Sequence, residues 1–169
     1  MRVKKLNARL SAMASYVGAG KSVADIGADH GYLPIHLIRE GISPFAVLTD
    51  VHPGPLEKTR VSLAKSRVAG DRIELRLGDG LQALDSGAVD IVVIAGMGGE
   101  TIISILAADK VKAESFWKYI LQPRTKADKL RDWLADRNWE ILAEERAYEK
   151  GRPCDIIVCS PGIKKEMES

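Results

Sequence analysis

The sequence predicts an α/β fold in which a mostly parallel sheet, covered by helices on both faces, is closed by an antiparallel C-terminal hairpin. Short apolar runs alternate with amphipathic segments of helical periodicity, which is typical of parallel strands joined by helices. Most of the apolar runs end in glycine, proline or a carboxylate, as expected at the ligand-binding edge of such a sheet. The last two runs are joined by a polar segment, residues 149–153, that is too short for a helix.

The expected strands differ in how apolar they are, and this difference places them within the sheet. Residues 89–94 are almost entirely apolar and are therefore expected at its centre. Residues 73–77 alternate apolar and charged side chains, which is the pattern of an edge strand with one solvent-exposed face. The full set of expected strands is 23–26, 46–49, 73–77, 89–94, 119–121, 139–146 and 155–160.

The expected helices fill the intervals between these strands. The first covers about residues 6–17, where apolar side chains recur at helical spacing, and Gly18 and Gly20 end it. Pro53 and Pro55 open a later helix, because the first helical positions do not need the N–H that proline lacks. Further helices are expected to begin near residues 33, 100 and 126.

Length and composition describe a single soluble domain. At 169 residues and 18.4 kDa the chain is large enough to bury one core. We expect this domain over residues 1–162, with a basic N-terminal helix in 1–20. Residues 163–169 form a charged tail that either frays or begins a further helical domain. No apolar run is long enough for a membrane span and no leader is evident, so the expected location is the cytoplasm.

The N-terminal segment carries charge of one sign. Arg2, Lys4, Lys5 and Arg9 all precede the first acid, Asp25, although the net charge of the chain is only +2. A basic segment of this kind suits an anionic partner such as RNA. A solvated basic helix face would give the same pattern without any partner.

Polar residues at the strand ends fit an adenosine that bears a compact polar tail. Asp50 ends the second strand, where a carboxylate can accept both hydroxyls of a ribose. Asp79 follows the third strand and can accept from the exocyclic amine of an adenine. Gly27 can adopt backbone angles closed to other residues and lets a ligand approach closely. Turn chemistry or helix capping would explain the same carboxylates without a ligand.

The glycine spacing distinguishes between two adenosine cofactors. Residues 27–31 read G-x-x-x-G, and the dinucleotide fingerprint G-x-G-x-x-G is absent. Asp25 and Asp29 flank this turn, and their charge would repel the pyrophosphate of NAD. S-Adenosylmethionine is cationic at sulfur and has a zwitterionic tail, so it tolerates both acids. The sequence therefore predicts S-adenosylmethionine as the cofactor.

Five ordered motifs resemble those of the bacterial tRNA (adenine(22)-N(1))-methyltransferases. They lie at residues 25–34, 49–56, 78–81, 95–99 and 121–123, and the likeness runs from about Leu6 to Ser160. The resemblance implies a Rossmann-like class I methyltransferase fold, S-adenosylmethionine as methyl donor and N1 of a tRNA adenine as acceptor. Members of the family carry asparagine where Arg124 stands, and they continue into a C-terminal helical domain for tRNA, most of which is missing from this sequence.

Candidate site residues follow from the motifs and from their place at the strand ends. Asp29 is expected to stabilise the cationic ring of the methylated base, beside Gly96 and Met97 at the transferred methyl group. Adenine N1 has an in-plane lone pair and needs no base, so positioning is the main requirement. The residues expected to bind the cofactor are Asp25, Gly27, Ala28, His30, Gly31, Asp50, Val51, Gly78, Asp79, Gly80, Ala95 and Gly96.

The expected acceptor, tRNA, requires basic side chains near the mouth of the pocket. The residues expected to contact it are Arg2, Lys4, Lys5 and Arg9, followed by Arg124 and Lys126. No spacing of His, Cys, Asp and Glu predicts a metal site, and the sequence does not define an oligomeric state.

Two other classes of function stay open at the level of sequence. One is a nicotinamide-dependent oxidoreductase on a similar sheet, and the missing dinucleotide fingerprint counts against it. The other is a non-catalytic module that binds S-adenosylmethionine or RNA and has kept the fold. The second class predicts cofactor binding without turnover.

Overall fold

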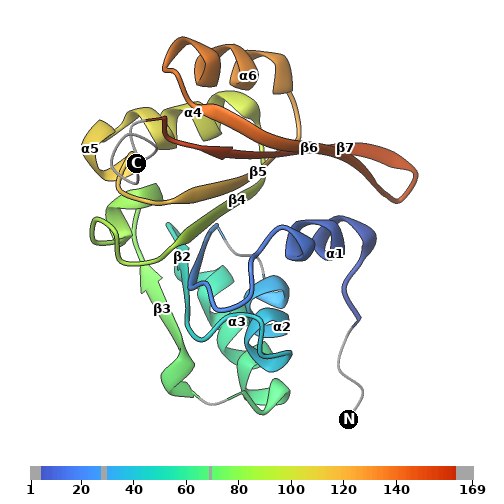
Figure 1. Ribbon diagram of the computed structural model, residues 1–169. Helices are drawn as coiled ribbons and strands as arrows, with labels where there is room; N and C mark the ends of the chain where they lie inside the picture. The colour runs from blue at the N-terminus through green and yellow to red at the C-terminus, as the bar shows by residue number, and fades with distance from the viewer. Residues whose placement is uncertain (1–4, 28–29, 69, 163–169) are drawn as a thin grey trace.

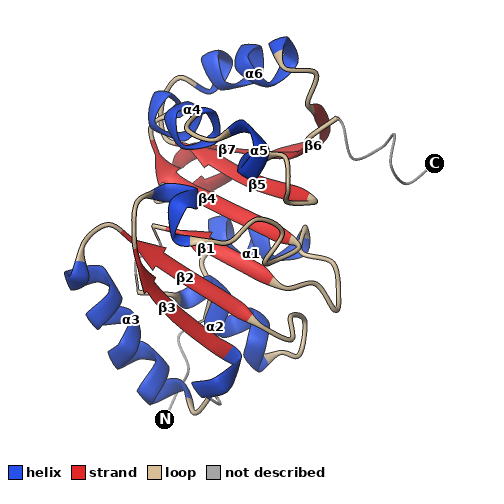
Figure 2. Cartoon of the chain, turned by 90° about the vertical axis from the view of Figure 1, so that its left-hand side faces the viewer, coloured by secondary structure: helices blue, strands red, loops and turns tan. Residues whose placement is uncertain are grey.

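The computed structural model describes residues 5–27, 30–68 and 70–162, which are organised around one seven-stranded sheet (Figure 1 and Figure 2). The strands lie in the order β3-β2-β1-β4-β5-β7-β6. β4 is therefore central and β3 lies at an edge, as the sequence predicts. The strands are β1 (Val23–Ile26), β2 (Ala46–Asp50), β3 (Ile73–Leu77), β4 (Ile91–Met97), β5 (Lys118–Pro123), β6 (Glu140–Glu149) and β7 (Arg152–Ser160).

The sheet is parallel except at its C-terminal end. β1 pairs with β2 and β4, β2 pairs with β3, and β4 pairs with β5, all in parallel. β7 pairs antiparallel with both β5 and β6, which confirms the expected closing hairpin. The carboxyl ends of β1 to β5 consequently share one edge of the sheet, which is where ligands bind in folds of this kind.

Helices on the two faces of the sheet enclose two apolar cores. One core joins α1 and α2 to strand residues that include Val23 and Val93, and the other joins α4 and α6 to residues that include Ala24 and Ile94. Successive strand residues thus face opposite cores, as a side-chain period of two requires. The helices are α1 (Ala8–Ser15), α2 (Tyr32–Arg39), α3 (Pro53–Ser66), α4 (Gly99–Ala107), α5 (Lys110–Ala113) and α6 (Ala127–Asp136), with 3-10 turns η1 (Gly70–Arg72) and η2 (Gly80–Ala83). Among the described residues, no helix is both long and apolar enough to span a membrane.

The C-terminal hairpin is longer than the sequence analysis predicts. The polar segment 149–153 was expected to be a loop, but β6 runs to Glu149 and β7 begins at Arg152. Only Lys150 and Gly151 form the turn, and their φ angles of 50° and 76° are those of a tight hairpin turn. Strands that project beyond their neighbours keep polar side chains on both faces, so their composition resembles that of a loop.

The edge strand β3 follows the predicted alternation only at its beginning. Ile73 is buried in the core, whereas Leu77 at the other end is 61% exposed. Leu77 pairs with Asp50, the last residue of β2, and so lies at the carboxyl edge of the sheet. The single buried face expected from the alternation over residues 73–77 therefore does not extend to Leu77.

α1 lies beside the far end of the C-terminal hairpin, although the two are separated by most of the sequence (Figure 1). Asn7, which caps α1, donates from Nδ2 to Glu149 Oε1 at 3.0 Å. Arg9 donates from Nε to Glu149 Oε2 at 2.9 Å. These bonds hold α1 against the end of β6 at the carboxyl edge of the sheet.

Candidate functional site

A cavity of about 490 Å³ opens at the carboxyl edge of the sheet, on the face covered by α4. The ends of β1, β2 and β4, the segment after β3, and the helices α4 and α5 all contribute to its wall. Its lining includes Gly27, Asp50, Val51, Gly78, Asp79, Gly80, Ala95, Gly96 and Met97, all of which the sequence analysis assigned to the site. The structure therefore brings together residues from four of the five predicted motifs, the glycine turn among them.

Asp50 is held in a defined position at the end of β2. Its Oδ1 accepts a hydrogen bond from the backbone N–H of His52 at 3.0 Å, and its carbonyl oxygen accepts from the N–H of Gly78 at 2.9 Å. The first bond uses one carboxylate oxygen and leaves the acceptor capacity of the other for the cavity. Asp79 is exposed at the N-terminal end of η2, and its side chain makes no capping hydrogen bond there.

The glycine turn after β1 is packed directly against the end of β4. Gly27 has a φ of 70°, and a Cβ added there would collide with Met97 Cε. Its N–H donates to the carbonyl oxygen of Thr49 at 2.9 Å, which joins the turn to β2. Glycine is therefore favoured at position 27 by its backbone angles, and a Cβ there would also displace the end of the Met97 side chain.

A second cavity, of about 480 Å³, lies on the opposite face of the sheet, beneath α1. Period-two alternation explains which strand residues reach it, because Asp25 and Val93 are register partners and share the α1 face. Its lining includes Arg9, Leu10, Asp25, His30, Tyr32, Arg124 and Glu149. The two cavities have Gly27, Ala95 and Gly96 in common, so they meet at the edge of the sheet.

Asp25 is the main titratable group of the second cavity. Burial raises the pKa of Asp25 from its ordinary value of 3.8 to about 7, although the positive charge of Arg9 acts in the opposite direction. Among the described residues no donor forms a hydrogen bond with this carboxylate. A carboxyl group of this kind is close to half ionised at neutral pH, and a cation placed beside it would draw it to the ionised form.

The other predicted cofactor residues occupy varied positions. His30 lines the second cavity, and its ring stacks on that of Tyr32 with the centroids 5.2 Å apart. Gly31 is buried, and a Cβ there would meet Leu48 and Thr59 at 2.7 Å, so its close approach is to protein side chains. Ala28 and Asp29 lie outside the described residues.

The predicted RNA contacts differ in how far their charges are already paired. Arg124 is exposed at the mouth of the second cavity and makes no ion pair within the described part of the chain. Lys126 is exposed but pairs with Glu100 at 3.0 Å. The side chain of Arg9 is only 18% exposed because Glu149 and the core cover it. Lys5 is exposed, while Arg2 and Lys4 lie outside the described residues.

Several lining residues carry no sequence signal that would have identified them. Thr101 and Lys112 belong to α4 and α5 and line the first cavity, although neither follows a strand directly. Glu149 was missed because its segment was interpreted as a loop. Within the described ranges, no group of three or more His, Cys, Asp or Glu side chains could hold a metal ion.

Comparison with known proteins identifies the family. A family model described as a methyltransferase domain matches residues 6–157. The tRNA (adenine(22)-N(1))-methyltransferase of Bacillus subtilis (strain 168) is 34% identical over 162 residues, which are 96% of this chain and 68% of that protein. The chain belongs to the bacterial tRNA (adenine(22)-N(1))-methyltransferase family. Its fold is the Rossmann-like methyltransferase fold that the motifs predict.

Solved structures of this methyltransferase family agree with the fold. A putative tRNA (m1A22) methyltransferase of Streptococcus pneumoniae, in complex with S-adenosyl-L-methionine, has a TM-score of 0.86 and 35% identity, covering 91% of this chain and 72% of that chain. An M. capricolum enzyme of the family, in complex with the cofactor product S-adenosyl-homocysteine, has a TM-score of 0.82 and 29% identity, covering 94% of this chain and 70% of that chain.

Proposed function

We propose that this chain transfers the methyl group of S-adenosylmethionine to N1 of an adenine in tRNA. The observation that carries the proposal is the meeting of two cavities at Gly27, Ala95 and Gly96. The first cavity can hold the adenosine part of the methyl donor and the second can admit the acceptor base, so donor and acceptor approach each other across the edge of the sheet. Membership of the family and the donor-bound and product-bound structures of its relatives support this chemistry.

The first cavity fits the adenosine part of the cofactor in size and in chemistry. A volume of about 490 Å³ lies in the range of small-molecule sites. Asp50 would accept the ribose hydroxyls through the oxygen that His52 does not use, and Asp79 would accept from the adenine amine. The amino-acid tail would cross Gly27 toward Asp25, where the carboxylate balances positive charge. When bound, the cofactor supplies a methyl group that its sulfonium makes electrophilic.

The chain's own contribution to the reaction is mainly one of position. Adenine N1 presents its lone pair in the plane of the ring and needs no deprotonation, so the enzyme must hold it in line with the methyl group. The turn 95–97 forms the floor at which both cavities meet. N1 lies on the Watson–Crick edge, so the target adenine must be unpaired or flipped out before it can enter.

Negative charge near the acceptor would stabilise the cationic ring that forms during transfer. Asp25 supplies a carboxyl group in the second cavity, and its proton is readily lost when a cation is nearby. Asp29 lies two residues beyond Gly27, and its role as the group that contacts the charged base is a proposal from the sequence. Electrostatic stabilisation of this kind commonly contributes factors of about 100 or more to a rate.

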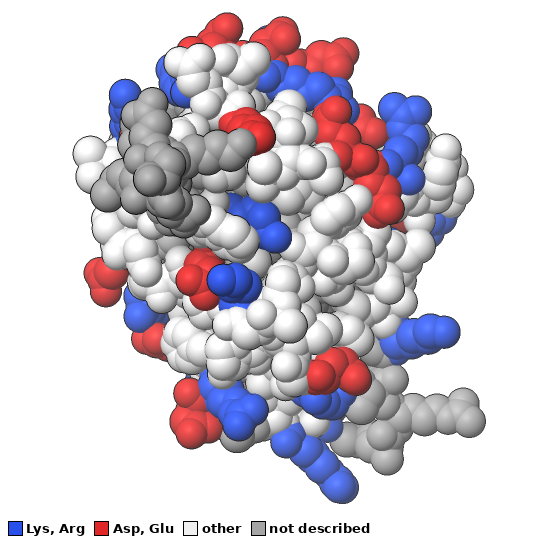
Figure 3. Space-filling model, in the orientation of Figure 1, with Lys and Arg blue, Asp and Glu red and all other residues white. Residues whose placement is uncertain are grey.

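A few exposed cations at the mouth of the second cavity are proposed to contact the tRNA backbone. Arg124 and Lys150 line that cavity and Lys126 lies in the adjoining loop; all three are exposed, as is Lys5 in the N-terminal segment. Figure 3 shows Lys and Arg interspersed with Asp and Glu on the face in view, rather than one continuous basic surface. Affinity for tRNA would then come from individual phosphate contacts and would fall steeply with salt.

The decisive experiment is nucleoside analysis of unmodified tRNA after incubation with the protein and S-adenosylmethionine. We expect 1-methyladenosine to accumulate, and primer extension to locate it at one adenine. A transcript with guanine at that position serves as the matched control. Calorimetry with S-adenosylmethionine and with NAD runs in parallel. Cofactor binding without any 1-methyladenosine would indicate a non-catalytic module, and binding of NAD alone would indicate an oxidoreductase.

A further inference from the structure

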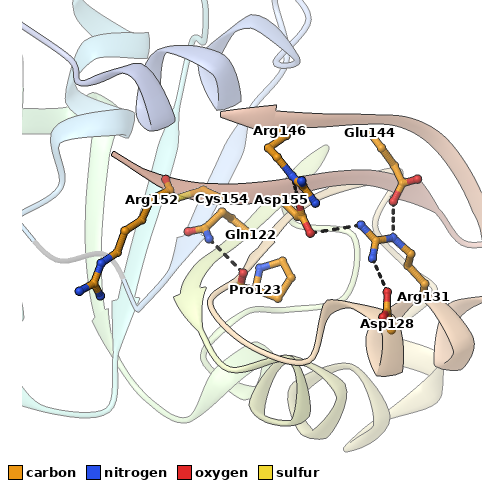
Figure 4. A network of polar contacts seen from close by, with 9 residues as sticks. All are labelled: Gln122, Pro123, Asp128, Arg131, Glu144, Arg146, Arg152, Cys154 and Asp155. Atoms are coloured by element: carbon orange, nitrogen blue, oxygen red, sulfur yellow. Dashed lines mark hydrogen bonds and ion pairs between the residues drawn. The ribbon is translucent and has the colours of Figure 1, made fainter. Parts of the chain in front are cut away.

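Gln122 is a buried polar residue whose amide group makes three hydrogen bonds at the site. The residue lies in β5, and only 2% of it is exposed. Oε1 accepts from the backbone N–H of Gly96 at 3.1 Å and from Arg9 Nη1 at 3.2 Å. Nε2 donates to the carbonyl oxygen of Pro123 at 3.1 Å (Figure 4). A buried amide is costly unless it is paired in this way, so the arrangement is well defined.

The bond to Gly96 is made at the point where the β4–β5 ladder becomes irregular. The register between these strands shifts between Ala95 and Met97, and Gly96 has a φ of 75°. The N–H of Gly96 is therefore directed to a side chain, and the next ladder bond runs from the N–H of Arg124 to the carbonyl oxygen of Met97 at 2.7 Å. Gln122 Oε1 is thus the side-chain acceptor that holds the N–H of Gly96 where the ladder is irregular.

Arg9, the second donor to Gln122, is itself held from the opposite end of the chain. Its Nε donates to Glu149 Oε2 at 2.9 Å, and Asn7 donates to the other oxygen of Glu149 at 3.0 Å. A continuous chain of hydrogen bonds thus runs from Glu149 through Arg9 and Gln122 to Gly96. It joins the tip of the C-terminal hairpin and α1 to the turn that separates the two cavities.

We propose that Gln122 is a positioning residue for methyl transfer, because its carbonyl oxygen fixes the Ala95–Met97 turn against α1. The inference rests on the proposed function, since the turn is taken to lie beside the transferred methyl group. Gln122 lines neither cavity, so it acts through the groups that it bonds, Gly96 and Arg9. A shift of about 1 Å in such a turn is enough to slow a reaction about 100-fold.

Two substitutions at this position separate the carbonyl acceptor from the rest of the side chain. Gln122→Met keeps the length of the side chain but removes the acceptor for Gly96 and Arg9. Gln122→Glu keeps an oxygen that can accept from both, loses the donor to Pro123, and adds a negative charge that Arg9 faces. The matched control is Tyr119→Phe, which removes a buried hydrogen bond to Ala113 at the other end of β5, far from the site.

The first measurement is amide hydrogen exchange by NMR, which does not depend on activity. We expect exchange at Gly96 to accelerate at least tenfold in Gln122→Met, to stay near the wild-type rate in Gln122→Glu, and to be unchanged in Tyr119→Phe. The N–H of Gly27, bonded to Thr49, should exchange at the same rate in all of them. Unchanged exchange at Gly96 in Gln122→Met would overturn the proposal.

The second measurement separates binding from turnover with tRNA at saturation. In Gln122→Met we expect kcat to fall about 100-fold while the Kd for S-adenosylmethionine changes less than about threefold, and Gln122→Glu should recover most of kcat. Accelerated exchange at Gly96 with wild-type kcat would also refute the positioning role. If the wild-type protein makes no 1-methyladenosine, the proposed function fails, and the exchange measurement still tests the link from Gln122 to the turn.

Discussion

Asp25 should make the folded protein less stable as the pH rises toward 8. Burial raises the pKa of this carboxyl from 3.8 to about 7, so the folded state holds the proton more tightly than the unfolded state does. The stabilising contribution of the bound proton is therefore complete below about pH 4 and is lost as the pH rises through about 7. Asp25→Asn keeps the shape of the side chain and cannot ionise, so it should remove this dependence.

The size of the effect follows from the two pKa values. The difference between 3.8 and about 7, at about 1.36 kcal/mol for each pKa unit, corresponds to about 4 kcal/mol over the whole range. Part of that range lies at acid pH, where other carboxylates also titrate. Between pH 5 and pH 8 we expect the stability of Asp25→Asn relative to the wild type to rise by about 2 to 3 kcal/mol.

Urea unfolding at pH 5, 6, 7 and 8, followed by circular dichroism, measures this difference directly. Ile120→Val is the matched control, because Ile120 faces the same core, is fully buried and has no titratable group. It should lose about 1 kcal/mol at every pH. A difference between Asp25→Asn and the wild type that stays constant from pH 5 to pH 8 would show that the carboxyl is already ionised in the folded protein.

Three further predictions concern the proposed cofactor, the glycine turn and tRNA. Asp50→Ala should weaken S-adenosylmethionine binding at least tenfold in calorimetry, whereas the control Asp71→Ala, in η1, should leave it unchanged. Equal affinities of Asp50→Ala and the wild type would show that Asp50 does not bind the ribose. Gly27→Ala should lower the free energy of unfolding by about 1 to 3 kcal/mol, because alanine is strained at a φ of 70° and displaces Met97. A loss below about 0.5 kcal/mol would mean that the backbone of the turn changes conformation to accept alanine. Arg124→Gln should reduce the slope of log affinity for tRNA against log salt concentration by about 1, whereas the control Lys58→Gln, on α3, should leave the slope unchanged. An unchanged slope in Arg124→Gln would exclude a phosphate contact at Arg124.

The fold could be predicted largely from local patterns. The almost continuous apolar run of β4 indicated the central strand, and the lack of a helix before β7 indicated the antiparallel closure. The length of the hairpin could not be predicted, because Glu149 and Arg152 extend a ladder that projects beyond the other strands. Pairing over that stretch depends on the neighbouring strand rather than on the residues' own preference for a strand.

The candidate site was predicted only where its residues follow strands directly. Asp50, Asp79 and Gly96 were found because the carboxyl ends of parallel strands converge, whatever the details of packing. Gln122 stands inside the motif at 121–123 but was assigned no role. Its hydrogen bonds reach Arg9 and Gly96, which are remote in sequence, and no local pattern reports such contacts.

The antiparallel hairpin brings these residues, which are remote in sequence, close together in space. Because β7 runs opposite to β5, β6 runs parallel to β5 and brings its last residue, Glu149, back to the carboxyl edge of the sheet. Glu149 binds Arg9, which reaches Gln122 and through it Gly96. β6, the strand farthest from the glycine turn in the sheet, is thus the one whose last residue holds α1 over the second cavity.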